Sequence, residues 1–249
     1  MQINVFEGAQ LTGKNAADKG AALLRQAIDK RGKAFVILAT GASQFEMLKA
    51  LIEKDDIDWA RCTIFHLDEY VGIDETHKAS FVRYLRERFL AHVPAVKQFV
   101  AINGNSGSIK GEIARINKMI SAVNIDVAFV GIGENSHLAF NDPPADFDTK
   151  DPYIVVDLDH ECRLQQKNEG WFKTLADVPE QAISMSISQI MKSRAIICTV
   201  PDLRKARAAK CAIEGPVSNL CPASILQEHK ASFLFLDQDA ASLLAARQD

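Results

Sequence analysis

The amino-acid sequence predicts an α/β protein with three layers, α/β/α, around a mostly parallel open sheet. Two observations support this fold class. Short runs of β-branched and other apolar residues alternate with longer segments whose apolar residues recur at helical spacing. No internal repeat or low-complexity linker interrupts this alternation, so we expect a single domain over residues 1–249.

The predicted elements are bounded by glycine, proline and polar turns. Strands are expected at residues 3–6, 34–38, 62–67, 125–131, 153–158, 182–187, 195–200 and 232–236. The run at 34–38 is continuously apolar, which is typical of a strand buried on both faces. Helices are expected at 15–29, 44–54, 80–89, 109–123 and 206–213, with 241–249 as a short helix or a frayed end.

The composition narrows the class of protein. With 249 residues, 47% of them hydrophobic, the chain can fill a core with helices on both sides of a sheet. The formal net charge is -3 and the basic residues are scattered, which argues against nucleic acid or an anionic membrane as partner. No signal-peptide pattern opens the sequence, and no apolar run reaches the roughly 20 residues of a membrane span. We therefore expect a soluble, cytoplasmic protein.

The cysteines and histidines give no metal pattern. The 5 cysteines include no CxxC pair, so buried or inert thiols in a reducing compartment are expected. His66, Asp68 and His77 are close in sequence, but their spacing matches no common zinc or iron motif. We expect no metal site.

The stretch 125–142 is the strongest candidate for chemistry. It reads as a buried strand followed by a glycine turn that carries Asn135, His137 and Asp142 beyond the strand's carboxyl end, where open α/β sheets place their sites. Gly131 and Gly133 would let a substrate approach the backbone. The alternative is a plain glycine turn whose histidine caps a helix.

A small-residue turn after the second strand predicts an anion site. Thr40, Gly41, Ala42 and Ser43 lie between a strand and a helix, so free backbone N–H groups and the helix dipole favour a phosphate there. Lys205 begins a later helix, where a cation opposes the dipole unless an anion lies between them. The alternatives are that Ser43 is an ordinary N-cap and that Lys205 is a solvated lysine.

Two adjacent carboxylates follow the third strand. Because successive strand side chains alternate, we expect Asp68 to face the cleft and Glu69 to support a turn or a helix start. Both could instead be solvated turn acids. Together with the anion turn and His137, Asp68 suits a phosphorylated sugar, held at one end and exposed to proton transfer at the other.

Four motifs, LATGAS, FHLDEYVGI, GIGENSHLAFNDP and EGPVSNLCPASILQEH, resemble those of the glucosamine-6-phosphate deaminase (isomerase) family, in the superfamily that includes 6-phosphogluconolactonase. The resemblance spans nearly the whole chain. It implies a Rossmann-like fold and conversion of glucosamine 6-phosphate, or an epimer such as galactosamine 6-phosphate, to a ketohexose 6-phosphate and ammonia. It also implies that no metal or organic cofactor takes part.

The resemblance also implies residue roles. Asp68 would move a proton between C2 and C1, and His137 would assist ring opening. Asn135 and Asp142 would orient and tune that histidine. The turn from Thr40 to Ser43 and Lys205 would bind the phosphate.

The chain departs from the family pattern at three places. Asn135-Ser136 replaces the usual Asp-Gly, and Asp142 replaces a glutamate. Where the family carries a phosphate-binding arginine this chain has Gly170, so Arg163 or Lys167 would have to substitute, and of the two we expect Arg163. The superfamily leaves open a lactonase-like hydrolase, and the changes at Asn135 and Asp142 leave open a non-catalytic sugar-phosphate-binding regulator. A homo-oligomer is also possible.

Overall fold

The computed structural model describes residues 1–245. Within this range a seven-stranded sheet has the order β1-β10-β9-β6-β2-β3-β5, and every strand pair in it is parallel. Its strands are β1 (Gln2–Phe6), β2 (Ala34–Leu38), β3 (Cys62–His66), β5 (Gln98–Val100), β6 (Val127–Val130), β9 (Ala195–Val200) and β10 (Ser232–Asp237). The predicted fold class is confirmed.

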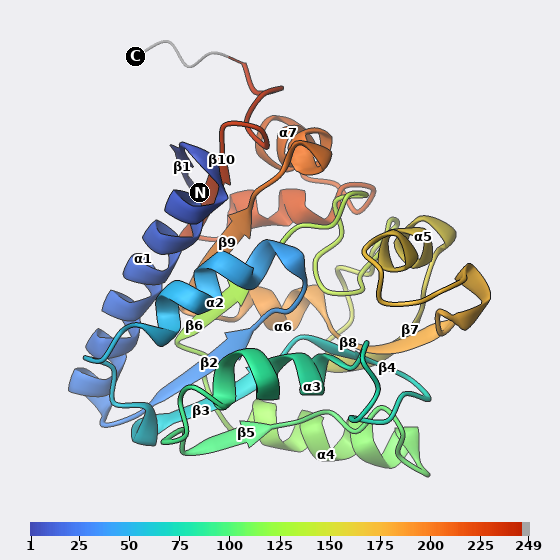
Figure 1. Cartoon of the computed structure of the whole chain (residues 1–249), viewed down its shortest axis with the longest axis horizontal. Helices are drawn as coiled ribbons and strands as arrows, with labels where there is room; N and C mark the ends of the chain where they lie inside the picture. Colours follow the sequence, from blue (N-terminus) through green and yellow to red (C-terminus); the bar gives the residue numbers. More distant parts are fainter. Residues whose placement is uncertain (246–249) are drawn as a thin grey trace.

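Helices cover both faces of this sheet (Figure 1). Helices α1 (Gly8–Arg31), α2 (Phe45–Ile52) and α3 (Phe81–Leu85) pack on one face, together with the π-helical turn Arg86–Leu90. Helices α4 (Ile109–Ser121), α6 (Ile187–Met191) and α7 (Ala206–Glu214) pack on the other. Val36 and Leu38 of β2 enter the first core and Ile37 enters the second, because strand side chains alternate. The continuous apolar run in β2 follows from this double burial.

A second, smaller sheet lies beside the first. It is antiparallel in the order β4-β8-β7, formed by β4 (Asp68–Tyr70), β7 (Tyr153–Asp157) and β8 (Gln181–Met185). Strand β4 follows β3 after the single residue Leu67, so one chain segment joins both sheets. Helix α5 (His160–Asn168) follows β7. The small sheet therefore connects Asp68 with α5.

Some elements differ from the prediction. Helix α1 begins at Gly8 rather than Asn15, and in its added turns Thr12 and Gly13 are buried, Gly13 against α2. The short elements β5, α5 and α6 were not predicted, since three to nine residues carry little periodicity. In the predicted tail, residues 241–243 form turns and 246–249 lie outside the described residues.

The cysteines fall into two groups. Cys211 of α7 and Cys221 are paired as a disulfide, with Cα atoms 6.4 Å apart, so the expectation of thiols alone is wrong for this pair. Cys62, Cys162 and Cys198 are free and buried. In the described part of the chain, no helix is long and apolar enough to cross a membrane.

Candidate active site

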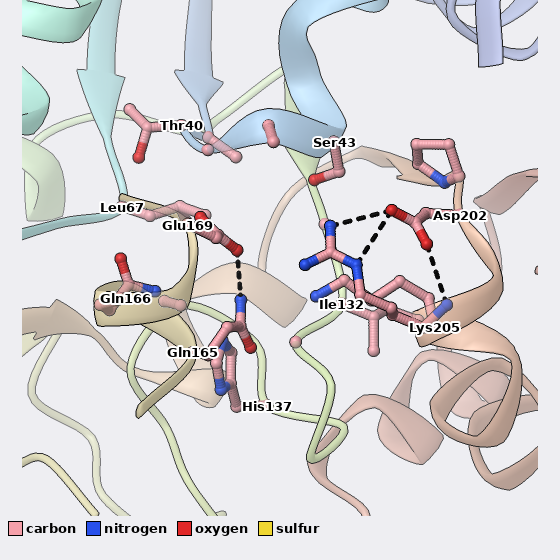
Figure 2. A pocket seen from close by; sticks show the side chains of 18 of the residues that line it. Thr40, Ser43, Leu67, Ile132, His137, Gln165, Gln166, Glu169, Asp202 and Lys205 are labelled. Atoms are coloured by element: carbon pink, nitrogen blue, oxygen red, sulfur yellow. Dashed lines mark hydrogen bonds and ion pairs between the residues drawn. The ribbon is translucent and has the colours of Figure 1, made fainter. Parts of the chain in front are cut away.

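A cavity of about 430 Å³ opens beyond the carboxyl ends of β2, β3, β6 and β9 (Figure 2). Parallel sheets commonly bind ligands at this edge. The cavity is lined mainly by residues 39–43, 67–68, 131–133, 137, 139–140, 165–166, 169, 201–202 and 204–205. Loops that are distant in sequence therefore meet in one place.

The turn after β2 forms one wall of the cavity. Gly41 has a φ of 92°, which glycine adopts without strain, and its carbonyl accepts a hydrogen bond from the Tyr84 hydroxyl at 2.9 Å. Gly131 permits the turn to approach β6, since a Cβ there would lie 3.1 Å from Ser43 Oγ. Within residues 1–245 the N–H groups of Ala42 and Ser43 make no backbone hydrogen bond. The turn thus offers free donors to an anion.

Asp68 and Glu69 lie on opposite sides of β4. Asp68 lines the cavity and is only 8% exposed. Glu69 is buried behind it, where its carboxylate accepts hydrogen bonds from the Ser80 hydroxyl at 2.7 Å and from the N–H groups of Phe81 and Val82 at 3.2 and 3.0 Å. Glu69 thereby anchors the start of α3. Burial, with the charge of Glu69 in addition, raises the pKa of Asp68 to about 8.

His137 lies in a tight turn at the floor of the cavity. A Cβ on Gly133 would come within 2.3 Å of the imidazole, so this turn requires glycine there. His137 Nδ1 lies 3.0 Å from Asp142 Oδ1, a close electrostatic contact rather than a well-aligned hydrogen bond. Burial alone would raise the pKa of Asp142, but its contacts with His137, Asn135 and the Asp159 backbone hold that pKa below its usual value.

Asn135 acts on Asp142 rather than on the imidazole. Its Oδ1 accepts from the His137 backbone N–H at 3.1 Å, and its Nδ2 donates to Asp142 Oδ1 at 2.9 Å. An amide suits this position, because a carboxylate would lie against that of Asp142. The structure thus groups Asn135, His137 and Asp142, while Asp68 joins His137 in the cavity wall.

Two cations line the wall formed by the turn after β9. Lys205 is 6% exposed, and burial lowers its pKa. Arg204 was not predicted. Its guanidinium donates to Asp202 Oδ2 at 3.1 and 2.8 Å and lies 3.3 Å from Glu134. The only sequence signal for Arg204 was its place beside Lys205.

The structure does not bring Arg163 to the cavity. Its guanidinium donates to the carbonyls of Leu175 and Val178 at 3.1 and 2.9 Å. Arg163 lies on α5 about 200° around the helix axis from Gln165, which does line the cavity. The sequence offered no means to decide which face of α5 meets the site.

Gln165 and Gln166 of α5 and Glu169, the C-cap residue that follows it, line the cavity and were missed. Gln165 donates to Glu169 Oε1 at 2.9 Å (Figure 2). It also accepts from the Glu134 N–H at 3.2 Å, so it links α5 to the turn after β6. The start of α5 had a signal in Asp159, an N-cap that accepts the third following N–H at 2.6 Å.

One group of neighbouring side chains consists of residue types that commonly bind metal ions. Donor atoms of His137, Asp142 and Cys162 lie within 4.8 Å of one another. Asp142 already accepts hydrogen bonds from Asn135 and the Asp159 N–H, and burial raises the pKa of the Cys162 thiol. These contacts describe a hydrogen-bonded support for His137 rather than a prepared ligand set.

The fold and the cavity together define an α/β protein with a candidate ligand site at the carboxyl edge of a parallel sheet. Residues 8–235 match the model of the family described as glucosamine-6-phosphate isomerases/6-phosphogluconolactonase. The chain belongs to this family, which confirms the resemblance seen in its motifs.

Several relatives are similar over nearly their whole length. A glucosamine-6-phosphate deaminase of Oenococcus oeni is 35% identical over 232 residues, covering 93% of this chain and 95% of that protein. One of Exiguobacterium sibiricum is 36% identical over 224 residues, covering 90% and 86%.

Solved structures of a deaminase and of 6-phosphogluconolactonases are also similar to this chain. A monomeric glucosamine-6-phosphate deaminase matches with a TM-score of 0.88 at 27% identity, covering 98% of this chain and 100% of that chain. A 6-phosphogluconolactonase of Trypanosoma brucei, at 15% identity and a TM-score of 0.80 over 98% of both chains, shares the fold alone. A homo-oligomer of the present chain stays a prediction.

The cavity loops contain three non-glycine residues with positive φ. These are Ser136 at 72°, Ala139 at 52° and Asp202 at 89°. Left-handed backbone is unfavourable for residues that carry a Cβ, and the cost is about 1–2 kcal/mol each. The turn around His137 is therefore held in place by its surroundings.

Replacing Ser136 with glycine should raise the free energy of unfolding by about 1 kcal/mol, because it removes this backbone cost. Urea unfolding measures the change. Ser121→Gly in the last turn of α4 is the matched control, and should lower stability by about 0.5 kcal/mol. A Ser136→Gly variant no more stable than the parent would contradict the assignment of strain.

Proposed function

We propose that this protein is a glucosamine-6-phosphate deaminase. It would convert glucosamine 6-phosphate, or an epimer such as galactosamine 6-phosphate, with water into a ketohexose 6-phosphate and ammonia. The observation that carries the proposal is that one cavity combines cations and free N–H donors on one side with a carboxylic acid and an imidazole on the other. The identity of about one third to deaminases over nearly the whole chain supports the same reaction.

The phosphate would bind between Lys205, Arg204 and the turn that contains Ser43. A buried lysine whose pKa is lowered gains most from an anionic partner, since the anion offsets its lost hydration. The binding energy of this remote group can then hold C1 and C2 of the sugar against the reacting side chains.

Asp68 and His137 would carry out the proton transfers. His137 assists ring opening at the ring oxygen, and Asp142 keeps the imidazole in place through the 3.0 Å contact. The Asp68 carboxylate takes the proton from C2 of the open-chain sugar and returns it to C1. This leaves an imine at C2, which water hydrolyses to the ketose and ammonia. Burial makes Asp68 a stronger base than an exposed aspartate.

A hydrolase of the lactonase type is less well supported. The 6-phosphogluconolactonase structures compared above are 20% identical or less and share the fold, whereas relatives of 33–36% identity are named deaminases. We also infer a cytoplasmic protein, in keeping with a sugar-phosphate substrate.

The purified protein should release ammonia and a ketose phosphate from at least one hexosamine 6-phosphate in a panel of epimers. Asp68→Asn, which keeps the size of the side chain but removes the base, should lower kcat by about 10²–10⁴-fold. Coupled assays for ammonia and for ketose phosphate measure both. Absence of both products from every epimer would refute the proposal.

The activity should depend on pH through Asp68. The carboxyl must be ionised to act as a base, so kcat/KM should rise about tenfold per pH unit below pH 8 and level off above it. ¹³C NMR of aspartate-labelled protein should show a carboxyl that titrates near pH 8 and is missing in Asp68→Asn. A kcat/KM that already levels off near pH 4, as for an exposed carboxyl, would contradict the effect of burial on the pKa of Asp68.

Lys205→Met should raise KM for the phosphorylated sugar by about 10- to 100-fold, because a charge-assisted contact to the phosphate is lost. Arg207→Met, on the exposed side of α7, is the matched control and should leave KM unchanged. Steady-state kinetics of both variants measure the two KM values. Equal KM values for the two variants would remove Lys205 from the phosphate site.

A further inference from the structure

Gln166 of α5 lines the cavity, yet the reaction described above gives it no role. The residue is 6% exposed, and its Oε1 accepts a hydrogen bond from the Tyr70 hydroxyl at 2.8 Å. Its Nε2 makes no hydrogen bond with any residue of the described range 1–245. A polar group so deeply buried is costly to leave without a partner, so this N–H donor is suited to a ligand in the cavity.

Tyr70 fixes which end of the Gln166 amide faces the cavity. Because the phenol hydroxyl donates to Oε1, the NH2 group is turned away from Tyr70. Tyr70 is itself fully buried, and its ring packs against those of Phe81 and Phe140 with centroids 5.0 and 5.3 Å away. Phe81 and Phe140 also line the cavity. Tyr70 is therefore a rigid support that presents Gln166 to the cavity as a hydrogen-bond donor.

Two neighbours of Gln166 connect it with Asp68. Tyr70 lies two residues after Asp68 on β4, so both side chains leave the same side of that strand. Cys162 lies one helical turn before Gln166, on the buried side of α5. Burial raises the pKa of Tyr70 and of Cys162, and the charge of Asp68 adds to both effects. The Asp68 carboxylate therefore lies within electrostatic reach of both residues that flank the Gln166 amide.

The same face of α5 also reaches the imidazole. Cys162 offers a sulfur that lies within 4.8 Å of ligand-type atoms of His137 and Asp142. In Figure 2, Gln166 and His137 lie on one side of the cavity, and Lys205 lies on the other. Gln166 thus belongs to the end of the cavity that holds the acid and the imidazole.

The proposed reaction needs a donor at this end. When Asp68 takes the proton from C2, the C–H electron pair forms the C1–C2 double bond and the carbonyl pair moves onto O1. This oxygen stays negative until it takes a proton from the C2 ammonium. Return of the first proton to C1 then leaves the imine. A fixed N–H donor at O1 stabilises this charge more strongly in the transition state than in the ground state.

The neighbouring polar side chains have other partners. Gln165 donates to Glu169 and accepts from the Glu134 N–H, so both ends of its amide are in use. His137 acts at the ring oxygen in the proposed reaction. Gln166 combines a free donor with a position beside Asp68, which is the combination that the charge on O1 requires.

We propose that Gln166 is a catalytic residue that donates from Nε2 to O1 of the open-chain sugar and stabilises the negative charge formed there. The proposal rests on the proposed function and extends it. Gln166 transfers no proton, since its amide acts only as a hydrogen-bond donor. Tyr70 is then a positioning residue, because it acts only through Gln166.

Two unreactive ligands test the proposal by binding alone. 5-Phosphoarabinonohydroxamate and 5-phosphoarabinonamide differ only in the hydroxamate oxygen, which takes the place of O1. Calorimetry should show that the unmodified protein binds the hydroxamate more tightly by about tenfold or more. Gln166→Glu can still accept from Tyr70 but has lost the N–H donor. In this variant the preference should vanish, through weaker binding of the hydroxamate and nearly unchanged binding of the amide.

Steady-state kinetics give a second readout. Gln166→Glu should lower kcat about 100-fold with KM nearly unchanged, because the lost contact is made in the transition state. Gln98→Glu, on the exposed end of the edge strand β5, is the matched control and should change neither kcat nor the ligand preference. Tyr70→Phe retains the donor but not its orientation, and should reduce the preference without abolishing it.

Three results would overturn the proposal. These are equal binding of the two ligands by the unmodified protein, equal weakening of both ligands in Gln166→Glu, and an unchanged preference in that variant. Failure of the unmodified protein to release ammonia, with a hydroxamate preference that Gln166→Glu abolishes, would have a different meaning. It would refute the proposed reaction and leave the contact between Gln166 and the ligand oxygen standing.

Discussion

The site depends above all on the buried carboxylate of Glu69. A charge without a cationic partner is tolerated in the interior only when hydrogen bonds satisfy it, and Glu69 accepts them from Ser80, Phe81 and Val82 at the start of α3. This fixes the one segment that runs from the large sheet into the small one. Asp68 is thereby held in the cavity wall, where burial first and the charge of Glu69 second raise its pKa and make it a stronger base.

The imidazole of His137 is positioned in a similar way, by one residue behind it and a second residue that holds the first. His137 faces the cavity, Asp142 lies behind it, and Asn135 holds Asp142. Gly133 leaves room for the ring, while Ser136 accepts a left-handed backbone to place it there. The chain therefore retains a carboxylate against the histidine even though an amide occupies the position nearest in sequence.

The sequence predicted the parts of the site that lie within single strand–turn motifs. Thr40 to Ser43 and Asp68 come within two residues of a strand end and His137 lies in the turn after β6, so the topology of a parallel sheet brings them to one edge. The wall formed by α5 could not be predicted in this way. Its helix is short and polar, and the side that faces the cavity is fixed by the antiparallel sheet beneath it. Arg163 was predicted to bind phosphate because of its charge, yet it lies on the other side of α5 from Gln165. The Cys211–Cys221 pair likewise depends on how α7 meets the following loop.

The small antiparallel sheet carries α5, whereas the large sheet carries most of the loops that hold the reacting groups. The acid, the imidazole and the anion turn belong to loops of the large sheet or to its immediate continuation, whereas α5 is attached through β7 and β8. Because Gln165 of α5 also accepts from the Glu134 N–H in the turn that precedes His137, a change on the cavity side of α5 would alter the lining and the position of this turn together.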